Sequence, residues 1–425
     1  MEEDEGLHEI HQVLHGYFEN DTRRRFQLEG PIASGADSIA WGVQQTTCGQ
    51  ACQRIVLKTP KWADLGGGEE DEETTEDGST AWNNDSNILD PIENEKKWLR
   101  CLILSLGRRQ QQVLRWAKHV MNIVEIPADP LNRRKSPLRR HGVENWMFIE
   151  WVEHGTLHRL VRRAREENIE YLPNRMLWRF FMCQETRGSQ LTDLQVIRMC
   201  IAMAWPPEQP IGPPEGAFEI IRQKPPLTIT HGDLHNENGP FELNPEYLEH
   251  DITPVLKMID LGKMSGNDHR GANFDATKEN IRDVGNLMHE LCTLLNPWER
   301  SDLYDGRQTA EFQPPIPINN VTTPIETEAV ALVLLPPRSD NETGNEIPCP
   351  RLDPDLRLLI CSCLAVHPRF RPGLAELFQA VVEAVHVRDA VWYSREGAGY
   401  CNPAMETDES ISGLLQLLLR DARTS

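Results

Sequence analysis

The stretch ITHGDLHNENGPF, residues 229–241, places several chemically capable side chains in one short loop. Asp233 carries a carboxylate that could act as a general base. Asn238, five residues later, offers a neutral oxygen of the kind that binds hard metal ions. His235 lies between them and is a further catalytic candidate. The spacing therefore favours a site that combines proton transfer with metal binding.

The bulk composition restricts the partners that such a site could serve. The chain has 425 residues, of which 39% are apolar, and its formal charge is −21. This length allows two lobes with sizeable cores. Nucleic acids and anionic membranes are bound through clustered Lys and Arg, so the charge argues against both. A basic protein substrate would instead be attracted.

The distribution of apolar residues and cysteines predicts an intracellular protein, cytoplasmic or nuclear. No run of eighteen or more apolar residues occurs, and the acidic stretch MEEDEGLHEI lacks the basic and then apolar order of a signal peptide. The ten cysteines form no CxxC pairs. We therefore expect reduced core cysteines rather than a disulfide framework or a zinc site.

The elements that must position the loop begin with a β-rich region. Residues 7–18 have apolar positions at helical spacing, and residues 26–43 and 53–58 are typical of a β-hairpin region. Residues 64–94 hold eleven acidic and no basic side chains, which predicts a disordered insertion. The segment NWMFIEWV, residues 145–152, predicts the last strand of this region.

A mainly helical region follows and contains the loop. Helical periodicity is clear in TLHRLVRRAREE, NRMLWRFFMC and VIRMCIAMAW, all of which precede the loop. After the loop come a predicted strand, VLKMID, and two predicted helices, NIRDVGNLMHELCTLL and DLRLLICSCLAV. The segment ISGLLQLLLRDA predicts an amphipathic helix that docks on this region.

This order of elements and motifs resembles the protein kinase family. Residues 231–238, His-Gly-Asp-Leu-His-Asn-Glu-Asn, are similar to its catalytic loop His-Arg-Asp-Leu-Lys-x-x-Asn. Residues 260–262, Asp-Leu-Gly, resemble its Asp-Phe-Gly motif, and residues 55–58, Ile-Val-Leu-Lys, resemble its third strand. Residues 367–372, His-Pro-Arg-Phe-Arg-Pro, resemble its Asp-Pro-x-x-Arg-Pro turn. The similarity extends over residues 26–385.

The resemblance assigns roles to four of these side chains. Asp260 and Asn238 would bind Mg²⁺ through oxygen, and Lys58 would hold the α and β phosphates of ATP. Asp233 would orient and deprotonate the attacking hydroxyl. Phosphoryl transfer mainly requires positioning and neutralisation of charge, so a charged ligand, a neutral ligand and a cation suit this chemistry.

The phosphate-binding lysine of this family is held by a carboxylate. Glu95 begins Glu-Lys-Lys-Trp-Leu, the helical pattern that supplies this partner in the family. Glu93 is the alternative. Lys58 and Glu95 are therefore grouped with Asp233 and His235 as the catalytic candidates.

The nucleotide-binding segments are less similar to those of the family. Ala33-Ser-Gly35-Ala-Asp-Ser38-Ile-Ala40 stands where Gly-x-Gly-x-x-Gly-x-Val is expected, so only the central glycine is kept. Residues 148–152 resemble the hinge that contacts the adenine edge. The alternative interpretation of residues 33–40 is an ordinary hairpin turn, and that of residues 148–152 is a buried edge strand that ends in a loop. The predicted nucleotide-binding residues are Ala33, Gly35, Ser38, Ala40, Lys58, Glu150 and Val152.

Several positions depart from the family pattern. Gly232 replaces the arginine that often grips a phosphorylated activation loop, and no Ala-Pro-Glu occurs between residues 260 and 280. Arg371 is therefore expected to lack its usual glutamate partner. Asn280 occupies the place of a family aspartate in the following helix, and Asp283 could substitute for it or be solvated.

The sequence as a whole predicts an α+β fold of the two-lobed protein kinase type. The predicted parts are a small β-rich lobe over residues 1–152, a larger helical lobe over 153–395 and a C-terminal tail over 396–425. The predicted function is an ATP- and Mg²⁺-dependent kinase acting on Ser or Thr of a protein. Two alternatives remain, a small-molecule phosphotransferase like choline and aminoglycoside kinases, and a catalytically inactive kinase-like binding module.

Overall fold

A computed structural model describes most of the predicted elements. It covers residues 2–19, 21, 24–35, 37–46, 52–61, 90–104, 121–126, 129, 131, 145–181, 200–201, 203–204, 226–239, 241–242, 253–266, 275–296, 299, 302–304, 306, 308–313, 324–334 and 348–419. The chain divides into two compact units. The first comprises Met1–Cys101, Met121–Trp151 and Leu261–Lys263, and the second comprises Leu102–Val120, Val152–Asp260 and Met264–Ser425. Helices and strands together make this an α+β protein.

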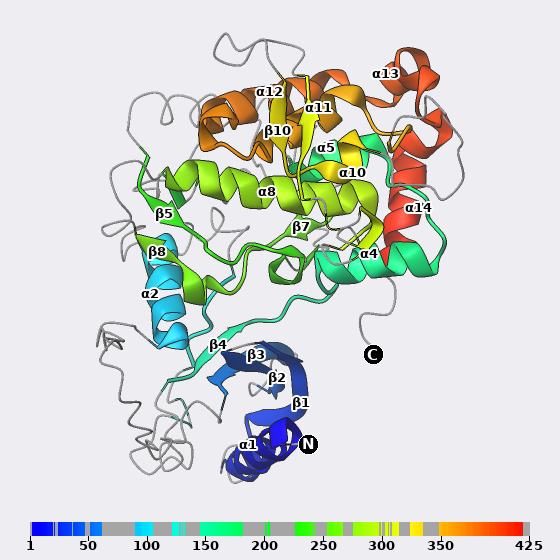
Figure 1. Ribbon diagram of the computed structural model, residues 1–425. Helices are drawn as coiled ribbons and strands as arrows, with labels where there is room; N and C mark the ends of the chain where they lie inside the picture. Colours follow the sequence, from blue (N-terminus) through cyan, green and yellow to red (C-terminus); the bar gives the residue numbers. More distant parts are fainter. Residues whose placement is uncertain are drawn as a thin grey trace, which may run out of the picture. The chain divides into compact units, whose positions relative to one another are not determined.

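The first unit is built on a four-stranded antiparallel sheet (Figure 1). Its strand order is β1-β2-β3-β4. Its elements are α1 (Glu2–Glu19), β1 (Phe26–Ser34), β2 (Ser38–Gln45), β3 (Gln53–Pro60), most of α2 (Pro91–Leu104), β4 (Met147–Glu150) and the short 3₁₀ helix η6 (Leu261–Lys263).

One face of this sheet is apolar because every second residue of β2 and β3 points to it. Trp41 pairs with Leu57 and Val43 pairs with Ile55, and all four side chains are fully buried. The Trp41 indole N–H donates a 2.9 Å hydrogen bond to the Thr59 hydroxyl, which satisfies a buried donor.

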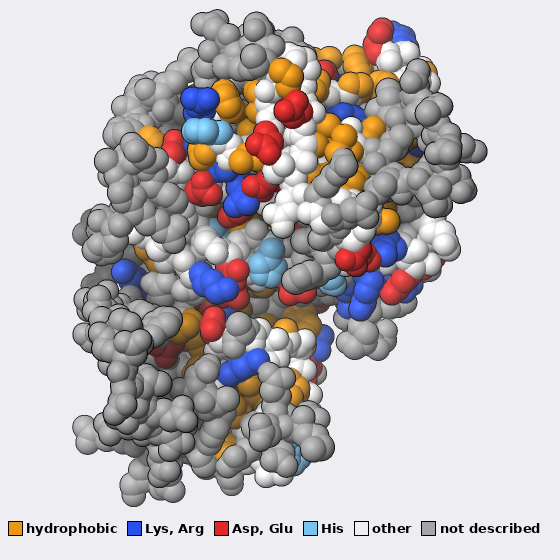
Figure 2. Space-filling view, viewed as in Figure 1, with side chains coloured by type: hydrophobic (Ala, Val, Ile, Leu, Met, Phe, Trp, Pro, Cys, Tyr) orange, Lys and Arg blue, Asp and Glu red, His pale blue; other side chains and the backbone are white. Residues whose placement is uncertain are grey.

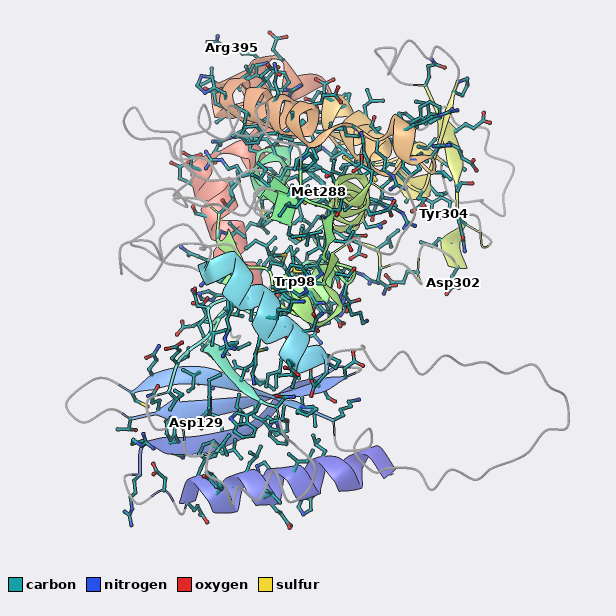
Figure 3. The ribbon with its side chains drawn as sticks, turned by 90° about the vertical axis from the view of Figure 1, so that its left-hand side faces the viewer. Trp98, Asp129, Met288, Asp302, Tyr304 and Arg395 are labelled. Carbon is teal, nitrogen blue, oxygen red and sulfur yellow. The ribbon has the colours of Figure 1, made fainter. Side chains whose placement is uncertain are left out.

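Helix α1 lies along this apolar face (Figure 3). Its buried residues Ile10, Leu14 and Phe18 recur at intervals of four, so they form one stripe that packs into the same core as Trp41. The sequence predicted this helix over residues 7–18, and it spans Glu2–Glu19.

The prediction of a disordered insertion over residues 64–94 is wrong for its last residues, because α2 begins at Pro91. Asp90 accepts a 2.8 Å hydrogen bond from the backbone N–H of Ile92, and Pro91 is the first residue of α2. This is the usual start of a helix, with an acceptor followed by proline. Ile92 is 1% exposed, so the segment is anchored by burial. The rest of the predicted insertion, residues 64–89, lies outside the described residues.

The second unit is mainly helical in the part of the chain that the structure describes. Its longer helices are α4 (Leu157–Glu166), α5 (Asn174–Phe181), α8 (Ala276–Thr293), α11 (Pro354–Cys363), α12 (Leu374–Val387) and α14 (Asp408–Leu419). Its shorter elements are β5 (Ile229–Thr230), η4 (Asn236–Asn238), β6 (Phe241–Glu242), β7 (Val255–Leu256), β8 (Ser265–Gly266), β9 (Ala310–Phe312), β10 (Ile325–Thr327), α10 (Val330–Val333), η7 (Pro368–Phe370), α13 (Ala390–Arg395), η8 (Gly397–Gly399) and η9 (Pro403–Glu406).

Helix α8 lies in the centre of this unit and packs closely on α11 (Figure 1). A Cβ atom at Gly285 would lie 2.9 Å from side-chain atoms of Cys363 and Leu364. Glycine at this position therefore allows the two helices to approach, and a larger side chain would separate them. Helix α14 is the amphipathic helix that the sequence predicted, and its apolar face is buried through Ile411, Leu415 and Leu418.

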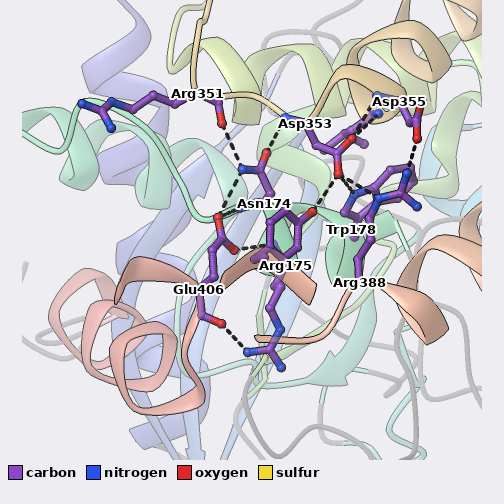
Figure 4. Close-up of polar contacts among 10 residues, drawn as sticks. Asn174, Arg175, Trp178, Arg351, Asp353, Asp355, Arg388 and Glu406 are labelled. Atoms are coloured by element: carbon purple, nitrogen blue, oxygen red, sulfur yellow. Dashed lines mark hydrogen bonds and ion pairs between the residues drawn. The ribbon is translucent and has the colours of Figure 1, made fainter. Parts of the chain in front are cut away.

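A buried polar network ties the C-terminal segment to α5 (Figure 4). The fully buried Glu406 carboxylate accepts 2.9 Å hydrogen bonds from the backbone N–H groups of Asn174 and Arg175. These are the first N–H groups of α5, which lack partners within the helix. A carboxylate at this end is also stabilised by the helix dipole.

The same network extends to α11 and α12 through Asp353. Asp353 is 1% exposed and accepts hydrogen bonds from Arg388 Nε at 2.9 Å and the Tyr393 hydroxyl at 2.8 Å. Its backbone N–H donates to Asn174 Oδ1 at 2.7 Å. Both buried carboxylates thus accept hydrogen bonds from the donors around them. A buried charge is tolerated under this condition.

Glu406→Ala is expected to lower the free energy of unfolding by about 3 kcal/mol, because it leaves the buried backbone N–H groups of Asn174 and Arg175 and the Asn174 side-chain amide without their carboxylate acceptor. Denaturant unfolding followed by circular dichroism measures this change. Glu409→Ala removes an exposed carboxylate from the same segment and is the control. Equal stability of the two variants would contradict the capping role of Glu406.

The described surface mixes the two signs of charge on the face drawn in Figure 2. Acidic and basic side chains are interspersed there rather than separated into patches. No helix among the described residues combines the length and apolar character needed to cross a membrane.

Candidate active site

The first unit contains the predicted pair of Lys58 and Glu95. Lys58 lies on β3, and its Nζ atom is 2.6 Å from Glu95 Oε2 on α2. Both residues are buried, at 8% and 2% exposure. Glu95 is buried because it shares one face of α2 with Ile92 and Leu99, at spacings of three and four.

The alternative partner, Glu93, points away from this buried face and is exposed. A lysine and a glutamate buried together are each costly to desolvate, so removal of one leaves the other charge uncompensated. Replacement of either residue alone is therefore expected to destabilise this unit. The role of the pair toward a nucleotide stays a prediction.

The segment in place of the glycine-rich loop is a short hairpin turn between β1 and β2. Gly35 N–H donates to Ser38 O at 2.8 Å, and Ala33 pairs with Ala40 across the two strands. Ser38 is buried, whereas Ala33 and Gly35 are exposed. A Cβ atom on Gly35 would meet only Ser38 O, at 3.7 Å, so the turn itself does not require glycine.

The predicted hinge residues continue from β4. Glu150 is held by Asn122, whose backbone N–H and side-chain amide donate to its carboxylate at 2.8 and 2.9 Å. The Glu150 N–H in turn donates to Asn122 O at 3.0 Å. The carboxylate and the N–H of Glu150 are thus already hydrogen-bonded to Asn122. Any contact with adenine would have to use the remaining polar groups of residues 150–152. Asn122 was missed because nothing in the sequence links it to a strand 28 residues away.

The second unit contains the loop with Asp233, which begins directly after β5. His231 is fully buried, and its Nε2 atom lies 3.2 Å from Ile259 O. Its Nδ1 atom accepts a hydrogen bond of 3.2 Å from Asp233 N–H. Burial lowers the pKa of His231 to about 4, so the ring is neutral at pH 7. The neutral tautomer with a proton on Nε2 satisfies both bonds.

Gly232 has a φ of +78°, in the left-handed region. Glycine adopts this conformation without the steric cost that a Cβ atom imposes. The arginine that the family often has at this position would be strained here.

Asp233, His235 and Asn238 lie together in the second unit. The Asn238 side-chain amide donates to Asp233 O at 2.9 Å and lies 3.1 Å from His235 Nε2. The nearest carboxylate oxygen of Asp233 is 3.9 Å from His235 Nε2. Asn238 is buried, whereas the side chains of Asp233 and His235 are partly exposed. The loop thus fixes the asparagine and leaves the carboxylate accessible to solvent.

The segment that carries Asp260 follows β7, which ends at Leu256, and is joined to this loop. Ile259 N–H donates to Asn238 O at 3.2 Å, and Ile259 O faces the His231 ring. Asp260 itself has a φ of +59°. Left-handed backbone is uncommon for residues other than glycine, and such outliers concentrate at functional sites.

The donor set suits Mg²⁺ only in part. Asp260 and Asn238 supply one charged and one neutral oxygen, which fits a hard cation. Within the described ranges, no group of three or more His, Cys, Asp or Glu side chains is arranged to hold a metal ion. A site of two protein ligands therefore requires phosphate or water oxygens to complete it, as Mg²⁺ sites commonly do.

The loop is anchored by Asn280 rather than by Asp283. Asn280 Oδ1 accepts from His231 N–H at 3.1 Å, and its Nδ2 donates to Ile229 O at 2.8 Å. An aspartate could make only the first of these bonds. The suggestion that Asp283 substitutes for the family aspartate is therefore wrong, because Asn280 makes the backbone contacts itself.

Arg371 has a glutamate partner despite the missing Ala-Pro-Glu. Its Nη1 atom lies 2.8 Å from Glu279 Oε1, and its Nε donates to Ala365 O at 2.9 Å. Glu279, in the first turn of α8, is thus a glutamate partner of Arg371 other than the Ala-Pro-Glu residue whose loss was expected. Lys278 also donates to Arg371 O, at 2.5 Å.

Asp283 makes a test of the electrostatics of α8 possible. Burial raises its pKa from 3.8 to about 7. Because the folded state binds this proton more tightly than the unfolded chain does, protonation of Asp283 stabilises the fold. This contribution to the free energy of unfolding is fully present below pH 3.8 and is lost as the pH rises through 7. Asp283→Asn cannot ionise at this position. The free energy of unfolding of this variant, relative to that of the native chain, is therefore expected to increase by about 2 kcal/mol as the pH rises from 5 to 8.5.

Thermal unfolding of the two proteins at both pH values measures this gain. The Tm advantage of Asp283→Asn over the native chain should be larger at pH 8.5 than at pH 5, because the cost of ionising Asp283 grows between pH 3.8 and about 7. A Tm difference that is the same at both values would show that Asp283 is not ionised at a cost in the folded state.

Comparison with known proteins adds no family assignment. No protein-family model matches the chain, and a search of curated proteins found no significant match.

Proposed function

We propose that this protein is an ATP- and Mg²⁺-dependent protein kinase that transfers the γ-phosphoryl group to a Ser or Thr hydroxyl of a protein. The observation that carries the proposal is the buried ion pair of Lys58 and Glu95. A lysine that is fixed by a carboxylate can present its charge to the phosphates of ATP without first being ordered. We also propose that the two units are the lobes of a protein-kinase-like fold.

The loop of the second unit supplies the remaining roles. Asp233 is partly exposed and would accept the proton of the attacking hydroxyl. Asn238 and Asp260 would hold Mg²⁺, which neutralises charge on the phosphate oxygens. The neutral His231 and Asn280 keep the loop in place through bonds to its backbone.

The proposed acceptor is a basic protein, since the net charge of −21 attracts cations. The same charge would attract cationic small molecules, and the loop His-Gly-Asp-Leu-His-Asn-Glu-Asn is also similar to that of choline and aminoglycoside kinases. ADP release should be measured with ATP, with and without Mg²⁺, in the presence of a basic protein, choline or kanamycin. Turnover that requires choline or kanamycin would favour the small-molecule reaction, and absence of all turnover would favour a binding module.

Lys58→Met is expected to lower kcat/KM by at least about a hundredfold, because it removes the cation that positions the phosphates. Lys97→Met is the matched control, since Lys97 is exposed on α2. Circular dichroism should establish that both variants fold, because Lys58→Met leaves Glu95 buried without its cation. A folded Lys58→Met variant with native kcat/KM would refute the assignment.

A further inference from the structure

Three histidines follow one side of α1. His8, His11 and His15 are three and four residues apart, so they project from the same side of the helix. This side adjoins the stripe that packs on the sheet. His11 is partly buried, whereas His8 and His15 are exposed.

His11 and His15 have the spacing of a chelating pair. Their ring centroids are 6.0 Å apart and their planes are inclined by 41°. Two imidazoles that share one metal ion, with bonds of about 2.0–2.1 Å, place their centroids about 5 Å apart in a tetrahedral arrangement. The His15 side chain is 50% exposed, so a small rotation about its own bonds can close this difference.

The surroundings of each ring limit its orientation. His11 stacks on Trp41, with ring centroids 5.9 Å apart and an interplanar angle of 28°. His15 Nδ1 lies 3.4 Å from Glu19 Oε2. A carboxylate that accepts a hydrogen bond from Nδ1–H favours the tautomer with an available lone pair on Nε2, which is the usual arrangement behind a metal-binding histidine.

We propose that His11 and His15 form a binding site for one divalent late transition-metal ion, such as Zn²⁺ or Ni²⁺. Imidazole nitrogen is a favoured ligand of these ions. Two protein ligands leave the other coordination positions to water. The ion would join two successive turns of α1 and so stabilise the helix that covers the apolar face of the sheet. This inference is independent of the proposed kinase activity.

Isothermal titration of the full-length protein with NiCl₂ near pH 7.5 tests the site. The native chain is expected to bind one equivalent of Ni²⁺ through this pair. His15→Asn should weaken this binding by at least about tenfold, because one of two ligands is lost. His8→Asn removes an exposed histidine from the same helix and should leave the affinity unchanged. Native affinity in His15→Asn, or equal loss in both variants, would overturn the proposal.

Thermal unfolding provides a second measurement that does not depend on the heat of binding. An ion that binds only the folded protein raises Tm with its concentration. Ni²⁺ should therefore raise the Tm of the native chain and of His8→Asn but not that of His15→Asn. A rise of the same size in all three proteins would place the ion on other groups, such as acidic side chains, and would refute the site.

Glu19→Gln tests the orienting role of the carboxylate. It is expected to weaken Ni²⁺ binding by about tenfold, as loss of a carboxylate behind a histidine ligand commonly does. An unchanged affinity in this variant would mean that Glu19 does not orient the His15 ring.

Discussion

Asp260→Asn is expected to abolish Mg²⁺-dependent ATP turnover while the protein stays folded. The substitution removes the only charged metal ligand among the proposed residues and leaves two neutral amides at Asn238 and position 260. Mg²⁺ binds weakly to such a pair because it gives up hydration water reluctantly. The fold should persist because asparagine tolerates the left-handed region, where Asp260 has a φ of +59°.

The measurement is ADP release at saturating ATP over a range of Mg²⁺ concentrations. Asp302→Asn is the matched control, since Asp302 is an exposed aspartate of the same unit. If Asp260→Asn keeps a rate near that of the control at all Mg²⁺ concentrations, Asp260 is not a metal ligand. If turnover returns only at high Mg²⁺, the loss is one of metal affinity, which supports the assignment.

Local periodicity predicted those parts of the molecule in which one face of an element is buried. The spacing of four in α1 and the alternation of Ile39, Trp41 and Val43 in β2 are visible in the sequence because each of these elements packs one face on the core. Residues 55–60 of β3 are all buried and do not alternate. The same reasoning places Glu95 on the buried side of α2, in register with Ile92 and Leu99. The pairing of Lys58 with Glu95 was implied by the resemblance to the protein kinase family, and the register of Glu95 on α2 agrees with the observed contact.

The error at the start of α2 has a compositional cause. The acidic segment 64–94 overlaps the stretch PIENEKKWLRCLILSL, which has helical spacing, so the two predictions disagree over residues 91–94. Asp90 and Pro91 stand at this boundary. That pair marks the beginning of a helix. A boundary drawn from capping residues would have ended the insertion before residue 90.

Other contacts depend on tertiary structure and had no local signal. Glu406 and Asn174 are 232 residues apart, and Asn122 and Glu150 are 28 residues apart. Such pairs form because buried N–H and carboxylate groups must find partners wherever the chain places them. Asn280 was noticed as a departure from the family pattern, yet only the structure reveals that its amide makes two backbone bonds where a carboxylate could make one.

The loop geometry leads to the expectation that Asp233→Asn lowers kcat by about 10²–10⁴, or about 3–5 kcal/mol of barrier. An amide cannot accept the proton of the attacking hydroxyl, so the chemical step is slowed. The bond that holds Asn238 should remain, because Asn238 donates to the backbone oxygen of residue 233 and not to its side chain. The loop and the metal ligands should therefore keep their positions.

ATP affinity provides the discriminating measurement, since a loss of positioning would weaken it and a loss of the base would not. The expected result is a KM for ATP within about twofold of the native value and a kcat reduced throughout the pH range. A native kcat would contradict the role of Asp233 as the base. A large rise in KM with little change in kcat would assign Asp233 to nucleotide binding, because only uniform binding energy would then have been lost.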